Sequence, residues 1–130
     1  MSDHFAQLSA FLGSTTDYPV YVDIPHKFEL DRLPAIGLYY VGPAERRPAL
    51  NSLGIDMEDI DVDIFIPKKT WVTGEAFKLA QLLRMQLYQF RTDDSRCLEV
   101  TRPTRRPDRN PTIRRLGMTV TVASPASPHF

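Results

Sequence analysis

A chain of 130 residues has the length of one ordinary domain and can bury a hydrophobic core without disulfide bonds. Its sixteen basic residues balance sixteen acidic ones, so no global field attracts nucleic acid or an anionic membrane. The lone Cys97 cannot form an intrachain disulfide. The N-terminus lacks the profile of a secretory signal, and no apolar run approaches the roughly 20 residues of a membrane span. We therefore expect a soluble protein made inside the cell.

The first part of the chain predicts one helix and two strands. Residues 2–13 are typical of a short amphipathic helix that Gly13 can close. Its apolar stripe consists of Phe5, Leu8, Phe11 and Leu12. Alternation predicts a strand in 18–25 (YPVYVDIP), and 33–43 (LPAIGLYYVGP) predicts a second strand that ends at a Gly-Pro turn. Residues 44–55 keep no sustained period and predict a loop.

An acidic segment follows, and its spacing raises the question of a metal site. Three of its acids are spaced two apart: Asp59, Asp61 and Asp63. A calcium loop starting at the first of them would need Gly at its sixth position and Glu at its twelfth, where Ile64 and Thr70 stand. The intervening residues are β-branched and alternate strictly, which predicts a half-buried strand over about 57–66 with the three carboxylates on its other face.

Three carboxylates in a row on one strand face repel one another, so we expect a basic segment opposite them. The candidate is the segment 101–115 (TRPTRRPDRNPTIRR). The arginines of this arm are Arg102, Arg105, Arg106, Arg109, Arg114 and Arg115. Its three prolines exclude a helix and disfavour a central strand, so we expect an extended arm or long hairpin. Three roles stay open: a solvated loop, a charge-complementary contact within one copy or between copies, and contact with nucleic acid phosphates.

Residues 73–90 predict a long helix, with Thr73 placed to cap its start. Its core stripe is Ala76, Leu79, Ala80, Leu83, Leu87 and Phe90. A second apolar stripe is Phe77, Leu82, Met85 and Tyr88. Such a helix is either deeply buried or contacts another subunit through its second face.

The chain then returns to strands, at 96–100 and at 115–123, before a short tail at 124–130 that we expect to be disordered. The resulting order is αβββαββ. It predicts one α+β domain (an α/β sandwich) over 1–123, in which two helices cover a mostly antiparallel or mixed sheet of about five strands with a long Arg-rich hairpin.

Motifs of catalysis or cofactor binding are absent from the sequence. The six glycines form no phosphate-binding loop, no serine lies in GxSxG, and the three histidines lack zinc-ligand spacing with Cys97. Cys97 lies in a predicted strand, where a small structural residue is expected rather than a nucleophile. We therefore expect no enzyme, no cofactor and no metal.

Several segments together resemble the tail terminator proteins of long-tailed (siphovirus-type) bacteriophages. They are the short N-terminal helix leading to YPVYVDIP, the strand LPAIGLYYVGP, the acidic strand DIDVDIFI, the helix with AFKLAQLLRMQL, and the final strand IRRLGMTVTVA. The resemblance covers most of the chain and concerns its overall pattern. It implies an α/β or α+β fold, no catalysis and no cofactor, and a homohexameric ring that caps the tail tube, stops its polymerisation and joins the head-side connector.

Under this resemblance the partners are other copies of the chain, the tail tube protein and the connector, and the location is the virion after assembly in the host cytoplasm. Candidate residues of the subunit or tube interface are Asp59, Asp61, Asp63, Arg102, Arg105, Arg106, Arg109, Phe77, Met85 and Tyr88. Reversing Arg105 and Arg106 to Glu is expected to disrupt assembly while the monomer stays folded. The alternatives are another neck protein of similar fold, or a small nucleic-acid-binding module that uses the arginine arm.

Overall fold

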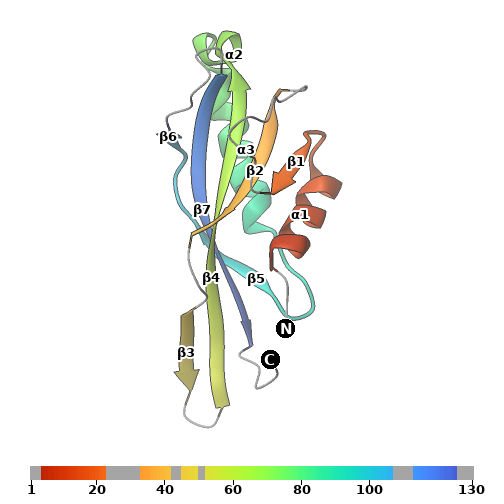
Figure 1. Cartoon of the computed structure of the whole chain (residues 1–130), viewed down its shortest axis with the longest axis vertical. Coiled ribbons are helices and arrows are strands. Elements are labelled where there is room, and N and C mark those ends of the chain that lie inside the picture. Colours follow the sequence, from red (N-terminus) through yellow and green to blue (C-terminus); the bar gives the residue numbers. More distant parts are fainter. Residues whose placement is uncertain (1–3, 23–32, 42–44, 50–51, 107–112, 126–130) are drawn as a thin grey trace.

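A computed structural model describes residues 4–22, 33–41, 45–49, 52–106 and 113–125 (Figure 1). The elements in chain order are α1 (His4–Thr15), β1 (Val20–Val22), β2 (Ala35–Tyr40), β3 (Glu45–Ala49), β4 (Ser52–Pro67), α2 (Lys68–Val72), α3 (Glu75–Tyr88), β5 (Arg96–Val100), β6 (Thr104–Arg106) and β7 (Ile113–Pro125). Seven strands form one sheet of order β1-β2-β4-β7-β5, to which β3 adds on β4 and β6 on β7. The β1–β2 pair is parallel and the other described pairs are antiparallel, which confirms the predicted α+β class.

The sheet is organised around the long antiparallel pair of β4 and β7, which stays in register from Ile55 opposite Pro125 to Pro67 opposite Ile113. The predicted alternation in β4 is confirmed, since its β-branched residues Ile60, Val62, Ile64 and Ile66 are fully or almost fully buried. The first three are opposite Val120, Met118 and Leu116 of β7, which are buried on the same face. This face of the sheet forms the floor of the core.

Helices α1 and α3 cover that one face of the sheet (Figure 1). They touch each other directly, because the rings of Phe11 and Phe90 meet edge to face at 5.5 Å and the Gln86 side chain donates a hydrogen bond to the Thr15 carbonyl. The predicted core stripe of α3 is confirmed, with Leu79 only partly buried and its other members fully or nearly so. At the far side of α1, buried His4 lies 3.3 Å from Glu58 of β4.

The predicted helix over 73–90 is confirmed as α3, but it begins at Glu75, so the cap assigned to Thr73 is wrong. Pro67 ends β4 in an extended conformation, and the one-turn helix α2 follows directly. Gly74 then takes a left-handed φ of 80° as the N-cap residue of α3, a conformation that costs glycine little. Thr73 instead ends α2, and its hydroxyl donates a hydrogen bond to the Thr70 carbonyl at 2.8 Å. Helix α1 also differs from its prediction, since it continues through Gly13 to Thr15.

The predicted loop over 44–55 is also wrong, because it contains β3 and the first residues of β4. These two strands form an antiparallel arm that projects beyond the helices at the lower end of the sheet (Figure 1). Alternation of apolar and polar residues arises where one face of a strand is buried. No helix covers the arm in the described structure, and this explains why its sequence shows no such period.

Two further boundaries differ from the prediction. The arginine arm contains the short strand β6, directly after Pro103, while Arg109 lies outside the described residues. Strand β7 continues to Pro125, two residues past the predicted domain end. Its last residues, Ser124 and Pro125, pair with Asp56 and Ile55 of β4, and Ser124 is buried there. The described chain therefore holds seven strands and three helices where about five and two were predicted.

Matched leucine substitutions test which side of α3 belongs to the core. Leu87→Ala removes a fully buried side chain and is expected to lower the free energy of unfolding by about 2–5 kcal/mol. Leu82→Ala removes a side chain that is 58% exposed and is expected to change it by less than about 0.5 kcal/mol. Urea denaturation of both variants measures the two values, and equal losses would contradict the described packing of α3.

Candidate functional site

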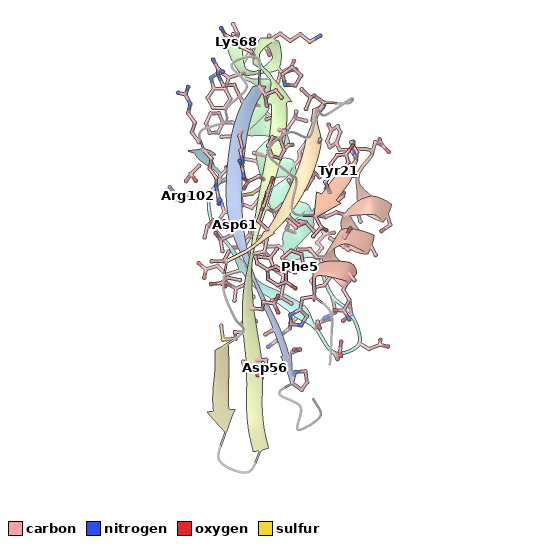
Figure 2. All side chains as sticks on the ribbon, viewed as in Figure 1. Phe5, Tyr21, Asp56, Asp61, Lys68 and Arg102 are labelled. Carbon is pink, nitrogen blue, oxygen red and sulfur yellow. The ribbon has the colours of Figure 1, made fainter. Side chains whose placement is uncertain are left out.

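The face of the sheet opposite the helices carries the acidic row, and we call it the open face. Asp59, Asp61 and Asp63 of β4 lie on it, as the sequence predicts, opposite Thr121, Thr119 and Gly117 of β7. Figure 2 shows Asp61 near the middle of the sheet, with Asp56 further along β4 toward the arm. Solvent exposure decreases along the row: Asp59 is exposed, Asp61 is about one-quarter exposed and Asp63 is completely buried. The three carboxylates therefore have different roles.

Asp63 is buried on the open face because two arginines cover it. The Arg115 guanidinium donates a hydrogen bond from Nε to Asp63 Oδ2, and Nη1 of Arg106 lies 3.5 Å from Oδ1. Oδ1 makes no hydrogen bond among the described residues. Burial raises the pKa of Asp63, and the charges of Arg115 and Arg106 offset part of that rise.

The arginines reach Asp63 because glycine stands beside it on both neighbouring strands, Gly37 on β2 and Gly117 on β7. A Cβ atom at Gly117 would lie 1.8 Å from Nε of Arg106, so only glycine leaves room for this side chain to cross β7. On the other side, the rings of Tyr39 and Phe65 approach the position of a Gly37 Cβ to 3.0 Å. Strand glycines of this kind mark a close approach of neighbouring groups.

Arg115 is itself held by aromatic side chains. Its guanidinium lies 5.0 Å from the ring centroids of both Tyr39 and Phe65, within the range of cation–π attraction. The stack fixes the guanidinium plane while Nε contacts Asp63. The group is therefore oriented by its surroundings and cannot easily turn toward solvent.

Asp61 joins the same network from its more accessible position. Nη1 of Arg106 donates a hydrogen bond to its Oδ2 at 2.8 Å, and the Thr119 hydroxyl donates one to its Oδ1 at 2.7 Å. Burial acts to raise the pKa of Asp61, but these two hydrogen bonds and the charges of Arg106 and Arg115 outweigh it and lower that pKa. The same contacts raise the pKa of Arg106. We call Asp61, Asp63, Arg106 and Arg115 the charge cluster.

The predicted pairing of the acidic row with arginines thus occurs within one copy. It brings Asp61 and Asp63 to Arg106, whereas the pairing to Arg115 was not singled out. One part of the earlier expectation is wrong: a Glu at position 106 would face two carboxylates, so reversing Arg106 cannot leave the monomer unperturbed. No arginine of the described ranges pairs with Asp59, whose carboxylate accepts a hydrogen bond from the Thr121 hydroxyl at 2.6 Å.

The remaining arginines of the arm lie elsewhere. Arg102 is exposed (Figure 2), and no ion pair joins it to another described residue. Arg105 is paired with Leu116 in the β6–β7 register and so projects to the helix side of the sheet, opposite to Arg106. There its guanidinium lies 5.2 Å from the ring centroid of Trp71 in α2, which in turn contacts the Phe77 ring at 5.4 Å.

The second apolar stripe of α3 is exposed in the single chain. Of the two predicted alternatives, a deeply buried helix and a helix with an accessible second face, the structure has the second. We call its four residues the outer ridge, and their exposed fractions are 48% for Phe77, 58% for Leu82, 63% for Met85 and 45% for Tyr88. The hydroxyl of Tyr88 and Nε of Arg84 both donate hydrogen bonds to the Val100 carbonyl, and these contacts attach α3 to the end of β5. The ridge points away from the core and toward solvent.

The described residues bring together no group of three or more His, Cys, Asp or Glu side chains that could hold a metal ion. Burial raises the pKa of the Cys97 thiol to about 11, so this thiol is a poor nucleophile at neutral pH. A pocket of about 460 Å³ lies apart from the charge cluster, between the ends of β4 and β7 and residues 91–96. Within the described ranges, no helix combines the length and apolar character that crossing a membrane requires.

Sequence reasoning missed the two glycines and the aromatic pair that complete the charge cluster. Gly37 and Gly117 each interrupt a strongly apolar alternating run, which is a signal for close approach. The signal does not say what approaches, because the register that places both glycines beside Asp63 joins residues 26 and 54 positions away from it. The same register brings Arg106 to Asp61 across 45 residues.

Comparison with known proteins shows the fold and no function. No protein-family model matches the chain, and no curated protein matches it. A solved structure whose name carries no description of function aligns with a TM-score of 0.54 and 14% sequence identity, covering 97% of this chain and 93% of that one. At this identity the likeness is one of fold alone.

Substituting the glycine under Arg106 tests the charge cluster. Gly117→Ala places a methyl group where the Arg106 side chain now lies, and we expect the guanidinium to leave both carboxylates. The loss of charge-assisted contacts to a buried carboxylate is expected to cost on the order of 1–3 kcal/mol, measured by urea denaturation. Gly13→Ala is the control, because its Cβ meets nothing within 4 Å at an exposed position of α1 and the change should stabilise the chain by about 0.5–1 kcal/mol. A neutral Gly117→Ala would contradict the described path of Arg106.

The pH dependence of stability tests the ionised state of Asp61. Its pKa is lower in the folded chain than the value of 3.8 expected when unfolded, so its ionised form stabilises the fold. This contribution is complete above the unfolded pKa and is lost as the pH falls through the folded pKa. At pH 7 we expect Asp61→Asn to be less stable than the parent chain by about 1–3 kcal/mol, a gap that narrows below about pH 4. A gap that stays constant down to pH 2 would show that charge is not involved.

Proposed function

We propose that this chain is a structural assembly protein of the tail terminator type, which acts as a ring of identical copies at the end of a phage tail tube. The observation that carries the proposal is the outer ridge of α3, an exposed apolar surface on a helix whose opposite side already lies in the core. The sequence resemblance implies a homohexameric ring, and the ridge provides a surface by which copies could associate. In this role the chain would stop tube polymerisation, bind the tail tube protein and the head-side connector, and reside in the virion.

The composition of the ridge supports an interaction role over a purely solvated one. Single exposed apolar residues are common on protein surfaces, but four large ones along one helix expose an apolar area that water covers at a cost. Phe77 extends this patch toward Trp71 and Arg105, and Tyr88 carries the Arg84 guanidinium at 5.8 Å from its ring centroid. Aromatic residues, Met and Arg are the types enriched in protein–protein interfaces.

A closed ring needs two different surfaces on each copy. If the ridge bound the ridge of a second copy, the contact would be isologous and assembly would stop at a dimer. A heterologous contact, in which the ridge binds another part of the next copy, can continue until the ring closes. The helix layer of this fold leaves such a second surface, because none of the described helices lies on the open face of the sheet.

The charge cluster reduces the support for a nucleic-acid-binding module. Arg106 and Arg115 contact carboxylates within the chain, so neither is available as an unpaired cation for phosphate. Among the described residues of the arginine arm, Arg102 and Arg105 remain exposed. Another neck protein of similar fold differs from a terminator in its partners, and the ring test below therefore includes the tube.

A charge placed on the ridge should prevent assembly without unfolding the chain. We expect the parent protein to form a discrete closed oligomer, above all a hexamer, in native mass spectrometry over a range of concentrations, alone or on tubes of the tail tube protein. Met85→Glu is expected to shift the population to monomer, because it buries a charge in an apolar contact. Its thermal midpoint should change by no more than a few degrees, since Met85 is 63% exposed in the single chain.

Ala10→Glu is the matched control, because it introduces the same charge at an exposed position of α1. It should leave the oligomer intact. Tubes that grow to the same length with and without the parent protein would contradict the terminator role, and a ring that forms without stopping them would favour another neck protein. A chain that stays monomeric both in solution and with tubes would contradict the proposal altogether.

A further inference from the structure

The acidic row and the two arginines of β6 do not all find partners within one copy. Asp61 and Asp63 pair with Arg106, whereas Asp59 is exposed and no ion pair joins it to another described residue. Arg105, next to Arg106, contacts the Trp71 ring, and no carboxylate pairs with it in the described part of the chain. Asp59 and Arg105 are therefore the members of this group without an ion-pair partner among the described residues, and both are at the surface.

These two groups cannot meet inside a single copy, because they lie on opposite faces of the sheet. Asp59 is opposite Thr121 on the open face, and Arg105 is opposite Leu116, a buried residue of the helix side. The strand register also places exposed Glu99 of β5 opposite Thr121, so two carboxylates flank this threonine on the open face. Exposed Arg96 of β5 lies opposite Ala123 on the same face, so the two carboxylates and this one guanidinium leave a net negative charge at the spot.

We propose that in the assembled protein the helix side of one copy covers the open face of the next, with Arg105 paired to the acidic spot formed by Asp59 and Glu99. This inference rests on the proposed function, since it names the second surface that a ring of copies needs. The outer ridge and the Trp71–Arg105 contact form the helix side of the interface. The occupant of the acidic spot is thus a second copy of this chain.

Three features favour this contact over others. The surfaces differ in charge, with Arg105 and Lys78 exposed beside the ridge and Asp59 and Glu99 on the open face, so that encounter is steered in one orientation. The contact joins opposite sides of the same sheet, which makes it heterologous and able to continue around a ring. It also gives the open face a helix layer like the one that already covers its other side.

A charge-swap experiment tests the pairing in the full chain. Arg105→Glu and Asp59→Arg are each expected to weaken the oligomer, raising the concentration of half-assembly by about tenfold or more, because each places like charges together. The double variant Asp59→Arg with Arg105→Glu should recover most of that loss. Native mass spectrometry across concentrations gives the values, and thermal midpoints verify that all variants remain folded, since both side chains are exposed.

Arg102→Glu is the matched control, an exposed arginine of the same arm that the inference leaves outside the pair. Equal weakening by Arg102→Glu and Arg105→Glu, or a double variant no better than the single ones, would overturn the pairing while leaving a ring-forming parent chain and the proposed function intact. A parent chain that never oligomerises, alone or on tubes, would overturn both. Selective loss with Arg105→Glu and its recovery in the double variant would establish the pair.

Discussion

The Asp63 carboxylate, buried beneath two guanidinium groups, is the constraint on which the rest of the sheet depends. A buried ionisable group is costly unless it is paired, so Arg106 and Arg115 must both occupy their places for the sheet to be stable. Arg106 needs glycine at position 117 to do so, and the aromatic rings that hold Arg115 lie close against Gly37. Three strands and the arginine arm are thereby held in one register by a single group of side chains.

The value of such a cluster lies in specificity more than in stability. A pair of long alternating strands could slip by two residues and still bury an apolar face. Slippage of β4 against β7 would move Asp63 away from Gly117 and from the Arg106 side chain that crosses β7 there. The cluster thus selects one register among several that the hydrophobic pattern alone would allow, and with it the positions of Asp59 and Arg105 at the surface.

Sequence predicts the parts of this fold that are governed by local periodicity. The core face of α3 and the alternation of β4 follow from the repeat of apolar residues, and the α+β class follows from their order. The arm of β3 could not be predicted because neither of its faces is covered by a helix, so burial imposes no pattern on it. The five-residue helix α2 is too short to show a helical period, and Gly74 separates it from α3. The charge cluster depends on contacts between distant residues: sequence indicated that arginines would meet the acidic row, but not that Arg106 and Arg105 would point to opposite faces.

The place of β7 in the sheet has a consequence for the order of events during synthesis. It is the last described strand of the chain, yet it lies inside the sheet, between β4 on one side and β5 and β6 on the other. Arg115, Gly117 and the strand that fixes both β4 and β6 therefore all arrive after every other described element has been made. A chain interrupted before β7 lacks the strand that joins β4 to β5 and β6, so neither the complete sheet nor its open face can form. Under the proposed function, incomplete chains would lack the surfaces for joining a ring, a form of quality control that needs no separate factor.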